Sequence, residues 1–484
     1  MKSRLWLTGL LVCALGTCAR ADEPEYAAVF ADGSKIGFMM HQRIVTGGQV
    51  HTTETMHLTI ARGGVVLPIG VQSTTIETTD GEPIRFEYAM DAGLMKQKTR
   101  GTIRPDGRLE VVAEMMGTTQ KQVLPWPKGA LMSEGLRLLE LKTELKEGES
   151  FTATVFEPSL LSAIEATVTV GPVVEVDLLG RVVRLTETTV VMQTPSGQVV
   201  TKAYVDEDLN TFKSVTEMLG MRLEIIACDK TFALSPNDVV DFLDKMLVPS
   251  PQPLEPTAAK AMVYHIVPTQ SDHGLQFPAT DYQQVDKAAD GSYRVTVRTK
   301  PIPTGQTFPY KGKDAELLEA LKPTTYLQCD QEAIQDLARQ AVGSVRDAGQ
   351  AAKKIEAFVD QYVSGKNLSV GYGTALEVVA SRQGDCTEHA VLTAAMCRAI
   401  GIPARVVFGL VYVDEFLGRE HVFGGHAWAE AWVGDTWVGL DATRSAQGFG
   451  PGYITLARGH GDPKDFFGMI HTLGYFRIAK IESR

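Results

Sequence analysis

The 484-residue chain contains only six cysteines, no cluster of basic residues and no long apolar run after Ala21. So few cysteines exclude a disulfide scaffold in a chain of this length. A formal net charge of −11, without a run of Lys or Arg, argues against nucleic-acid binding. Because a membrane span needs about 20 consecutive apolar residues, no integral membrane span is expected. The chain also lacks the motifs of a dinucleotide site, a P-loop or a zinc site, so neither a cofactor nor a metal is predicted.

The first 21 residues have the composition of a secretory signal peptide. Lys2 and Arg4 precede the apolar segment Leu5–Thr17, and Ala19-Arg20-Ala21 is typical of a cleavage site. The apolar segment is too short for a stable membrane anchor. The protein is therefore predicted to be exported, either to the periplasm or to the medium.

Two questions about cysteines stay open at the level of the sequence. Cys18 follows Leu15-Gly16-Thr17, a loose match to a lipoprotein signal, but threonine directly before the cysteine fits that signal poorly. Lipid anchoring at Cys18 is therefore the less favoured alternative. Cys228 and Cys329 could form a disulfide, which the sequence alone does not decide.

From residue 22 to residue 247 the sequence is typical of β-strands joined by tight turns. Alternating segments such as Ile84–Tyr88 are separated by turn signals such as Asp80-Gly81 and Asp106-Gly107. This pattern predicts a β-rich, antiparallel N-terminal region. One short helix is expected near its end, over Asn237–Met246.

A faint internal repeat occurs within this β-rich region. Arg108–Ala113 is similar to Arg222–Ala227, which suggests two related antiparallel units, 22–135 and 136–247. The alternative is a chance similarity between β-meanders. The region contains no cluster of titratable residues that suggests chemistry, so its predicted role is scaffolding or contact with a partner in the cell envelope.

The rest of the chain divides into a linker, a small β subdomain and a helical part. Four prolines within 248–257 favour an extended, semi-rigid linker. Strands such as Ser292–Val297 predict a small β subdomain over 258–325, and residues 326–484 form the predicted catalytic domain. Two helices are expected where apolar residues recur at helical spacing: Ile334, Leu337, Ala338, Ala341 and Val342, then Ala351, Ile355, Phe358, Val359 and Tyr362.

A cysteine stands at the predicted start of a further helix. Asp385 suits the N-cap and Glu388, three residues later, completes a capping box. Gly401 and Pro403 end the helix. Cys386 therefore occupies the first helical position, where unpaired N–H groups and the helix dipole favour a thiolate.

A predicted β-hairpin brings a histidine and an aspartate together. Ala427, Ala429, Ala431 and Val433 alternate with His426, Trp428, Glu430 and Trp432, and Gly434-Asp435 is a two-residue turn signal. The turn would pair Val433 with Thr436. In that register His426 is the diagonal, same-face neighbour of Asp441. If the helix that carries Cys386 packs closely on the alanine face, a Cys–His–Asp triad results.

Several neighbouring residues have other interpretations. His389 lies one helical turn from Cys386 and is a rival base, although no carboxylate strand is predicted to orient it. Cys386 itself could be an inert, half-buried thiol. Ala404–Val413 is expected to be a central strand, and the polar segment Asp414–Gly425 a loop over the cleft. Core packing is the favoured reading for Cys397 and for three tryptophans, Trp428, Trp432 and Trp437.

Together these segments closely resemble the transglutaminase-like superfamily. The resemblance covers residues 326–456 and rests on four matching segments: Gly384–Ala390, Gly401–Arg405, His426–Glu430 and Trp437–Thr443. It implies an α+β fold with a papain-like core of helices and antiparallel sheet, preceded here by the β-rich N-terminal region. It also implies that Cys386, His426 and Asp441 are the catalytic triad.

The function that follows is an exported cysteine enzyme that acts on amide bonds of proteins or peptides through a thioacyl intermediate. Transfer to water would make it a protease or amidase, and transfer to an amine a transglutaminase; the resemblance favours hydrolysis slightly. The backbone N–H of Cys386 is one expected oxyanion donor, and Tyr372 and Gln383 are candidates for the second. The alternative function is a catalytically silent binding or scaffolding module of the cell envelope.

Overall fold

The computed structural model describes residues 23–484, apart from positions 63, 93–94, 116–117, 144, 195–196, 244–245, 270–274, 367–372, 462–464, 466–468 and 470–471. The predicted signal peptide, Cys18 and Tyr372 therefore lie outside the described residues. Two compact units are present, one ending at Phe242 and the other spanning Leu243–Arg484. The fold is mostly antiparallel sheet, with 52% strand and seven helices in the described part of the chain. Helix content is lower than the α+β prediction implied.

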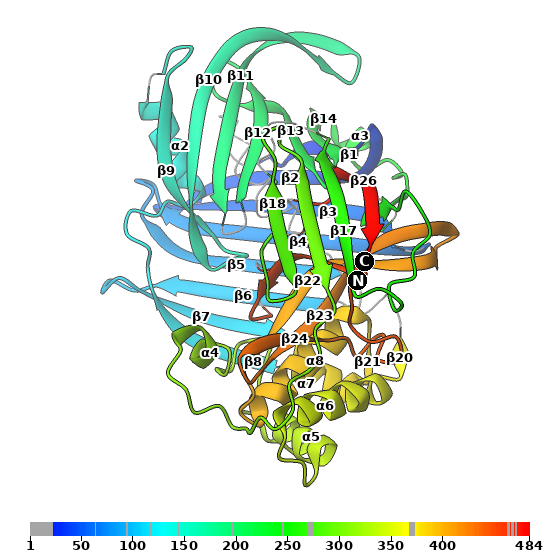
Figure 1. The fold of residues 1–484 in the computed structure, drawn as a ribbon. Coiled ribbons are helices and arrows are strands. Elements are labelled where there is room, and N and C mark those ends of the chain that lie inside the picture. Colours follow the sequence, from blue (N-terminus) through cyan, green and yellow to red (C-terminus); the bar gives the residue numbers. More distant parts are fainter. Residues whose placement is uncertain are drawn as a thin grey trace. The chain divides into compact units, whose positions relative to one another are not determined.

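The N-terminal unit consists of one large sheet made of two meanders (Figure 1). The first meander contains β1 (Glu25–Ala31), β2 (Ser34–Thr46), β3 (Gln49–Arg62), β4 (Val65–Thr78), β5 (Pro83–Ala92), β6 (Met95–Ile103), β7 (Arg108–Met115) and β8 (Thr118–Pro125). The second contains β9 (Ser150–Glu157), β10 (Ser162–Leu178), β11 (Arg181–Thr194), β12 (Gly197–Val205), β13 (Thr211–Met218) and β14 (Met221–Cys228). Antiparallel pairing of β1 with β14 joins them, so β8 and β9 stand at the two ends of the sheet.

Alternation of side chains explains why these segments form strands. In β5 the side chains of Phe86 and Tyr88 are buried, whereas Arg85, the residue directly before Phe86, is exposed. The predicted repeat is not confirmed by this topology and stays a prediction. Arg108–Ala113 lies in β7, which is followed by β8, whereas Arg222–Ala227 lies in β14, which is followed by the short helix α3 (Lys230–Ala233).

The helix predicted over Asn237–Met246 is wrong in the described part of that segment. Val240 and Asp241 form a short strand, β15, which pairs in parallel with β3 at Ile60 and Ala61. The pairing of β2 with β3 begins only at Leu58, so this edge of β3 is open beyond Leu58. Extended pairing at an open edge therefore replaces the helix that the local apolar spacing favoured.

Helix α2 (Ser133–Lys142) is held by a carboxylate from the sheet. Its N-cap residue makes no side-chain cap hydrogen bond. The buried carboxylate of Glu77 on β4 accepts hydrogen bonds from the N–H groups of Glu134 (2.7 Å) and Gly135 (2.9 Å) instead. The turn after β4 also comes very near the helix, because a Cβ atom at Gly81 would lie 2.7 Å from the Cα of Gly135.

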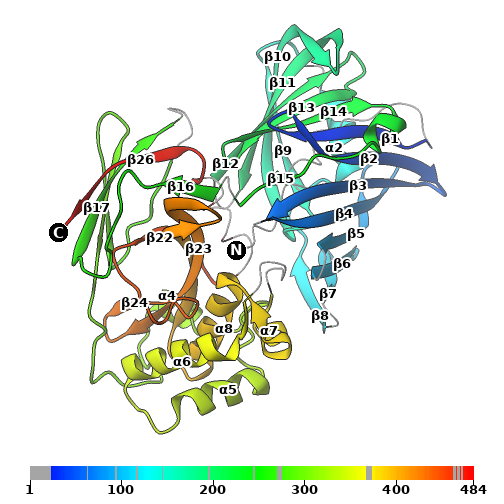
Figure 2. The same ribbon diagram turned by 90° about the vertical axis from the view of Figure 1, so that its right-hand side faces the viewer.

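The C-terminal unit contains two sheets and a group of helices. The first sheet has the order β16 (Leu247–Pro249), β23 (Arg419–Val433), β22 (Ala404–Phe416) and β25 (Tyr453–Gly459), with β24 (Thr436–Leu440) paired to β23. The second has the order β18 (Gln283–Lys287), β19 (Tyr293–Arg298), β17 (Ala261–Pro268) and β26 (Phe476–Ser483). The helices are α4 (Ala315–Glu319), α5 (Glu332–Val342), α6 (Ala348–Tyr362), α7 (Ala375–Ser381) and α8 (Cys386–Ala399). Helices α5–α8 lie together, apart from the β17–β26 sheet (Figure 2).

Three segments of this unit differ from the expectation. The predicted proline-rich linker begins within β16, because Val248 and Pro249 pair with β23 as part of this edge strand. The small β subdomain is completed by β26 from the C-terminus. The segment Asp414–Gly425 is not a loop: β22 and β23 continue through it as a hairpin with a tight turn at Leu417-Gly418.

Removal of the Glu77 carboxylate should destabilise the N-terminal unit. In Glu77→Ala two buried N–H groups of α2 lose their acceptor, and hydrogen bonds to a charged group contribute about 1.5–3 kcal/mol each. We expect the free energy of unfolding to fall by about 3–6 kcal/mol, measured by urea titration with circular dichroism. The control is Glu82→Ala, which removes an exposed carboxylate near the same turn. Equal stability of the two variants would contradict the capping role.

Candidate active site

Helix α8 begins at Cys386, as predicted, and its start is fixed by reciprocal capping. The Asp385 side chain accepts a hydrogen bond from the N–H of Thr387 (2.9 Å), and the Glu388 carboxylate accepts one from the N–H of Asp385 (2.8 Å). A Cβ atom at Gly384 would lie 2.3 Å from the Cβ of Glu388, so only glycine fits directly before the cap. Nearly all of α8 is buried, and it packs on β23.

The predicted hairpin register is confirmed. Val433 pairs with Thr436 and Ala429 pairs with Leu440. Asp441 directly follows β24, and its Oδ2 atom lies 2.7 Å from Nε2 of His426 on β23. Both side chains are buried, with relative exposures of 7% for His426 and 0% for Asp441. The register therefore brings an imidazole and a carboxylate into a hydrogen bond away from water.

His426 is in contact with a thiol as well as with a carboxylate. Burial acts to lower the pKa of His426, but the charges and hydrogen bonds of Asp441 and Cys386 outweigh burial and raise this pKa to about 10. Because Nε2 faces Asp441, Nδ1 is the ring nitrogen that remains for the thiol. The arrangement places the His426 ring between the Cys386 thiol and the Asp441 carboxylate, which is the geometry that lets a histidine accept a proton from sulfur during nucleophilic attack.

The Asp441 carboxylate is held by further donors. Tyr453 donates a hydrogen bond to Oδ2 (2.7 Å) and the N–H of Thr443 donates one to Oδ1 (3.0 Å). Burial acts to raise the pKa of Asp441, but His426 and then Tyr453 outweigh it and lower this pKa. The N–H of Asp441 donates to the buried carboxylate of Glu356 on α6 (2.7 Å). Asp441 is thus fixed on both its side chain and its backbone.

Tyr453 and Glu356 were missed by the sequence argument, for different reasons. Tyr453 opens β25, which reaches the site by pairing with β22, and this non-local pairing has no local signal in the sequence. Glu356 did have a signal. It stands at helical spacing with Ala352 and Val359 on the buried stripe of α6, and a carboxylate in an apolar stripe indicates a specific partner.

The other candidate residues are placed as follows. His389 is fully buried, and its Nδ1 lies 2.6 Å from the carbonyl oxygen of Asp385 in its own helix. Gln383 is exposed, three residues before Cys386, in the short strand β21 (Gln383–Gly384). Trp428 and Trp437 are buried in the core and Trp432 is half-buried. The described residues contain no group of three or more His, Cys, Asp or Glu side chains arranged to hold a metal, and no helix long and apolar enough to cross a membrane.

The cysteines differ in their surroundings. Cys228, Cys329, Cys386 and Cys397 are free thiols. Cys228 belongs to the N-terminal unit and Cys329 to the C-terminal unit, so their pairing stays an open prediction. Burial raises the pKa of Cys228 and Cys329, and it raises that of Cys397 to about 12. Of the four described thiols, Cys386 is the one that hydrogen-bonds to a histidine.

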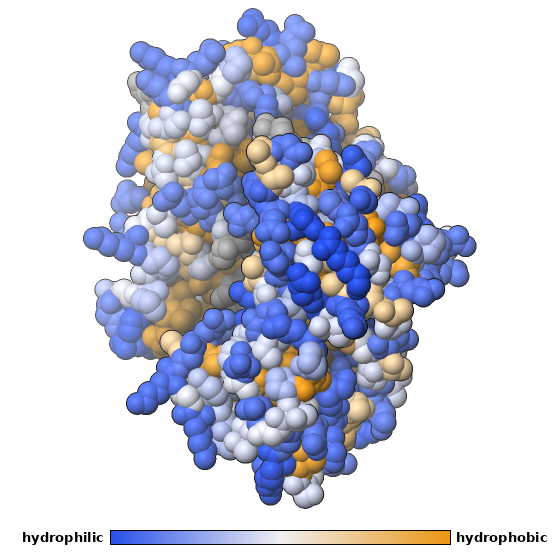
Figure 3. Space-filling view, in the orientation of Figure 1, coloured by the Kyte–Doolittle hydropathy of each residue, from blue (hydrophilic) through white to orange (hydrophobic). Residues whose placement is uncertain are grey.

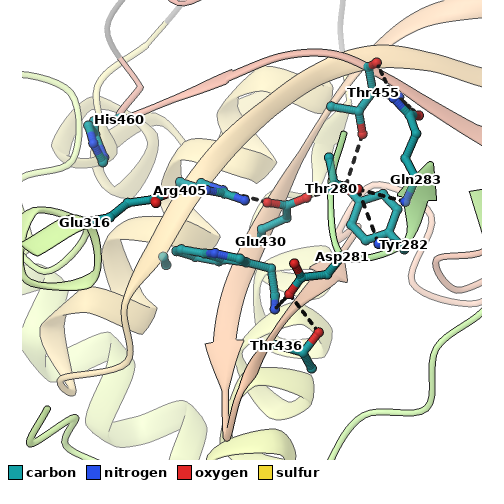
Figure 4. Close-up of polar contacts among 12 residues, drawn as sticks. Thr280, Asp281, Tyr282, Gln283, Glu316, Arg405, Glu430, Thr436, Thr455 and His460 are labelled. Carbon is teal, nitrogen blue, oxygen red and sulfur yellow. Dashed lines mark hydrogen bonds and ion pairs between the residues drawn. The ribbon is translucent and has the colours of Figure 1, made fainter. Parts of the chain in front are cut away.

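A buried ion pair supports the hairpin that carries the site (Figure 4). Arg405 and Glu430 face each other across β22 and β23, with 2.6 Å between Nε of Arg405 and Oε2 of Glu430. The Arg405 guanidinium also lies 3.8 Å from the ring centroid of Trp437 and binds Glu316 on α4 at 2.8 Å. Tyr282 donates a hydrogen bond to Glu430 from the segment before β18.

The same segment fixes the two strands next to the site (Figure 4). Asp281 accepts hydrogen bonds from the N–H of Trp437 (2.7 Å) and the hydroxyl of Thr436 (2.8 Å) in β24. The side-chain amide of Gln283 exchanges two hydrogen bonds with the backbone of Thr455 in β25, at 2.8 and 3.0 Å. Because β24 leads into Asp441 and β25 opens with Tyr453, these contacts position both residues.

The sequence model of the transglutaminase-like superfamily matches residues 335–442. The chain contains a transglutaminase-like domain. The match extends from α5 to just beyond Asp441 and includes all three residues of the proposed triad. The α8 helix and the β22–β24 sheet of this transglutaminase-like domain therefore carry the site.

Relatives match a limited part of the chain. An uncharacterised protein of Mycobacterium tuberculosis is 34% identical over 106 residues, which are 20% of this chain and 33% of the relative. A Mycobacterium bovis protein matches to the same extent. The chain thus spans about a third of the length of these curated relatives.

Two solved structures are also similar. A candidate cysteine protease from Cytophaga hutchinsonii is 21% identical, with 47% of this chain and 82% of that chain covered and a TM-score of 0.30. A candidate protease from Parabacteroides distasonis is 12% identical, with 72% and 64% covered and a TM-score of 0.19.

The contact with His426 should make Cys386 reactive at low pH. We expect iodoacetamide at pH 6 to modify Cys386 at least about ten times faster than Cys329 or Cys397, as measured by mass spectrometry of the full chain. Because the raised pKa of His426 is about 10, the imidazolium persists through neutral pH and is lost only as the pH rises through about 10. In His426→Gln, iodoacetamide at pH 6 should modify Cys386 no faster than the other thiols, whose own rates of modification should not change. A single pH profile shared by all thiols would refute the ion pair.

The buried ion pair predicts a large loss of stability on truncation. In Glu430→Ala the buried Arg405 guanidinium loses its buried carboxylate and keeps the Trp437 ring and the carboxylate of Glu316, which is mostly exposed. Removing one partner of a buried pair costs about 3–5 kcal/mol. Tryptophan fluorescence during urea unfolding checks this, since Trp428, Trp432 and Trp437 lie in this unit. The matched control is Glu420→Ala, an exposed carboxylate on the same strand, which should change stability by less than about 0.5 kcal/mol.

Proposed function

We propose that this protein is an exported, cysteine-dependent enzyme that cleaves or exchanges amide bonds of proteins or peptides. The observation that supports the proposal most is the position of His426, which contacts the Cys386 thiol and hydrogen-bonds to Asp441 at 2.7 Å. Export is inferred from residues 1–21 of the sequence.

The first half-reaction follows from the charges of the site. The Cys386 thiolate attacks the carbonyl carbon of the substrate, and a bond forms between sulfur and carbon. As the carbon–nitrogen bond breaks, the His426 imidazolium gives its proton to the departing amine. Asp441 keeps the imidazole oriented and compensates its positive charge without itself taking up the proton. The product is a thioester on Cys386.

The second half-reaction returns the enzyme to its starting state. Neutral His426 takes a proton from the acceptor, which is a water molecule or an amine, while the acceptor attacks the thioester carbon. The carbon–sulfur bond breaks and the thiolate–imidazolium pair is restored. Both acceptors use the same residues, so a hydrolase and a transglutaminase are two outcomes of one site.

The oxyanion formed in each half-reaction needs hydrogen-bond donors. The N–H of Cys386 at the first position of α8 is the proposed first donor, because N–H groups at a helix start have no partner within the helix. Gln383 is a candidate for the second donor, since it precedes Cys386 by three residues. Tyr372 is the other candidate for the second donor, on the basis of the sequence alone.

Turnover should depend on Cys386 and more weakly on Asp441. Two assays distinguish the acceptors: release of fluorescent peptides from labelled casein reports hydrolysis, and incorporation of a dansylated amine into methylated casein reports transfer. Cys386→Ala should reduce either activity to background. Asp441→Asn should lower kcat/KM by about 10³–10⁴, because the imidazole loses its orientation but the nucleophile remains.

A matched control separates chemistry from folding. Cys397→Ala removes a fully buried thiol from the same helix and should retain activity. If Cys386→Ala keeps its turnover, the mechanism is wrong. If the unmodified chain is inactive in both assays but binds a partner that Cys386→Ala also binds, a non-catalytic envelope module becomes the better description.

A further inference from the structure

The N-terminal unit contains a cavity that the proposed enzyme chemistry does not use. Its volume is about 350 Å³, which lies within the usual range for ligand pockets and is more than twice the roughly 150 Å³ of an apolar cavity that binds benzene. It is lined on one side by residues of strands β9–β13 and on the other by residues of helix α2 and of the segment that follows it. Both walls belong to one unit, so the cavity is complete within it.

The walls of the cavity are mostly apolar, although four threonines also contribute to them: Thr143, Thr186, Thr188 and Thr211. Alternate residues of the strands face it, including Ala153 and Val155 on β9 and Ala166 and Val168 on β10. Leu136 of α2 closes the opposite side. The inner face is thus an apolar surface suited to a hydrocarbon chain. Apolar residues also show on the surface at the top of Figure 3, where β10 and β11 lie. Val173, which lines the outer part of the cavity, is itself 51% exposed.

All charges on the cavity lining have the same sign. Four carboxylates line it, and none of its described lining residues is Lys, Arg or His: Glu140, Glu147, Asp206 and Glu207. Glu147 and Glu207 are exposed at the rim. Asp206 is engaged in its own turn, where it accepts hydrogen bonds from the N–H and the side-chain amide of Asn210 at 2.8 and 2.9 Å. This leaves Glu140 as the acidic group that meets the apolar interior.

Glu140 is half-buried on the wall of the cavity and lacks the partners that carboxylates in apolar surroundings normally have. Among the described residues no group donates a hydrogen bond to its carboxylate, although its backbone carbonyl accepts one from the N–H of Thr143 (3.1 Å). Burial raises the pKa of Glu140 to about 7, and Arg137 opposes this shift only in part. The Arg137 guanidinium is itself bound to the buried carboxylate of Glu134, with 2.9 Å between Nε and Oε2. A cation from outside the chain would satisfy Glu140.

We propose that this cavity binds a small amphiphilic cation, with its hydrocarbon chain against the strands β9–β12 and its ammonium group on the Glu140 carboxylate. The mostly apolar walls favour a ligand with a hydrocarbon chain, and because every charged lining residue is acidic, the site disfavours fatty acids and other anionic amphiphiles. The proposal concerns a binding site in the other unit and is independent of chemistry at Cys386.

Two probes of equal chain length and opposite charge test the proposal. Octylamine and octanoate are titrated separately into the full chain below their micellar concentrations, with isothermal titration calorimetry as the readout. We expect octylamine to bind once per chain and octanoate to bind at least about tenfold more weakly, since a charge-assisted hydrogen bond contributes at least about 1.4 kcal/mol.

Two kinds of variant locate the site. Glu140→Gln keeps the size of the side chain and should weaken octylamine binding about tenfold. The difference in affinity between octylamine and octanoate should therefore become smaller in this variant. Ala166→Phe should fill the cavity and abolish binding of both probes; Val168→Phe replaces it if circular dichroism shows that Ala166→Phe is unfolded. Cys386→Ala is the control that should leave octylamine binding unchanged.

The outcomes separate the parts of the proposal. Saturable octylamine binding that is lost on filling and weakened by Glu140→Gln supports it. Equal affinity for octylamine and octanoate overturns the assignment of a cation. Octylamine binding that survives in a folded, cavity-filled variant overturns the assignment of the cavity, and absence of octylamine binding to the unmodified chain overturns both.

Discussion

The hydrogen bond between His426 and Asp441 is the interaction on which the C-terminal unit depends. An imidazolium and a carboxylate are both costly to bury, and each is tolerated here because the other lies 2.7 Å away. The hydrogen bond therefore depends on the register of β23 against β24, since a shift by one residue would place His426 on the opposite face. Much of the surrounding structure, including Tyr453, Glu356 and the Arg405–Glu430 pair, keeps this geometry.

The N-terminal unit follows a different physical principle. It is one continuous sheet, because β1, the first strand of the first meander, pairs with β14, the last strand of the second. The strands β8 and β9 therefore lie at the two ends of the sheet. A sheet of this length must bury its inner face against something. Helix α2, anchored by Glu77, covers part of that face, and the remaining space next to the helix is the apolar cavity.

The parts of the site that the sequence predicted are those made by residues near each other in the chain. Asp385 and Glu388 cap α8 within one turn, and the Gly434-Asp435 turn alone sets the register that brings His426 to Asp441. Tyr453 and the segment 280–283 could not be foreseen, because strand pairing across the sheet brings them to the site. For the same reason the helix expected over Asn237–Met246 gave way to a strand at an open edge. Local patterns predict elements and turns, but they do not predict which distant edge a segment will pair with.

Asp441 and Glu140 show what separates a structurally satisfied acid from one that awaits a partner. Asp441 is completely buried, yet it accepts hydrogen bonds from an imidazole, a phenol and an amide, so its pKa is lowered and it stays ionised. Glu140 faces an apolar cavity without such donors, and burial raises its pKa instead. A carboxylate on an apolar wall without hydrogen-bond donors lowers the stability of the folded protein. Asp441 shows that this chain can supply such donors to a carboxylate, and at Glu140 it does not. A ligand that supplies the missing positive charge would remove that cost, whereas at Asp441 the chain itself already does so.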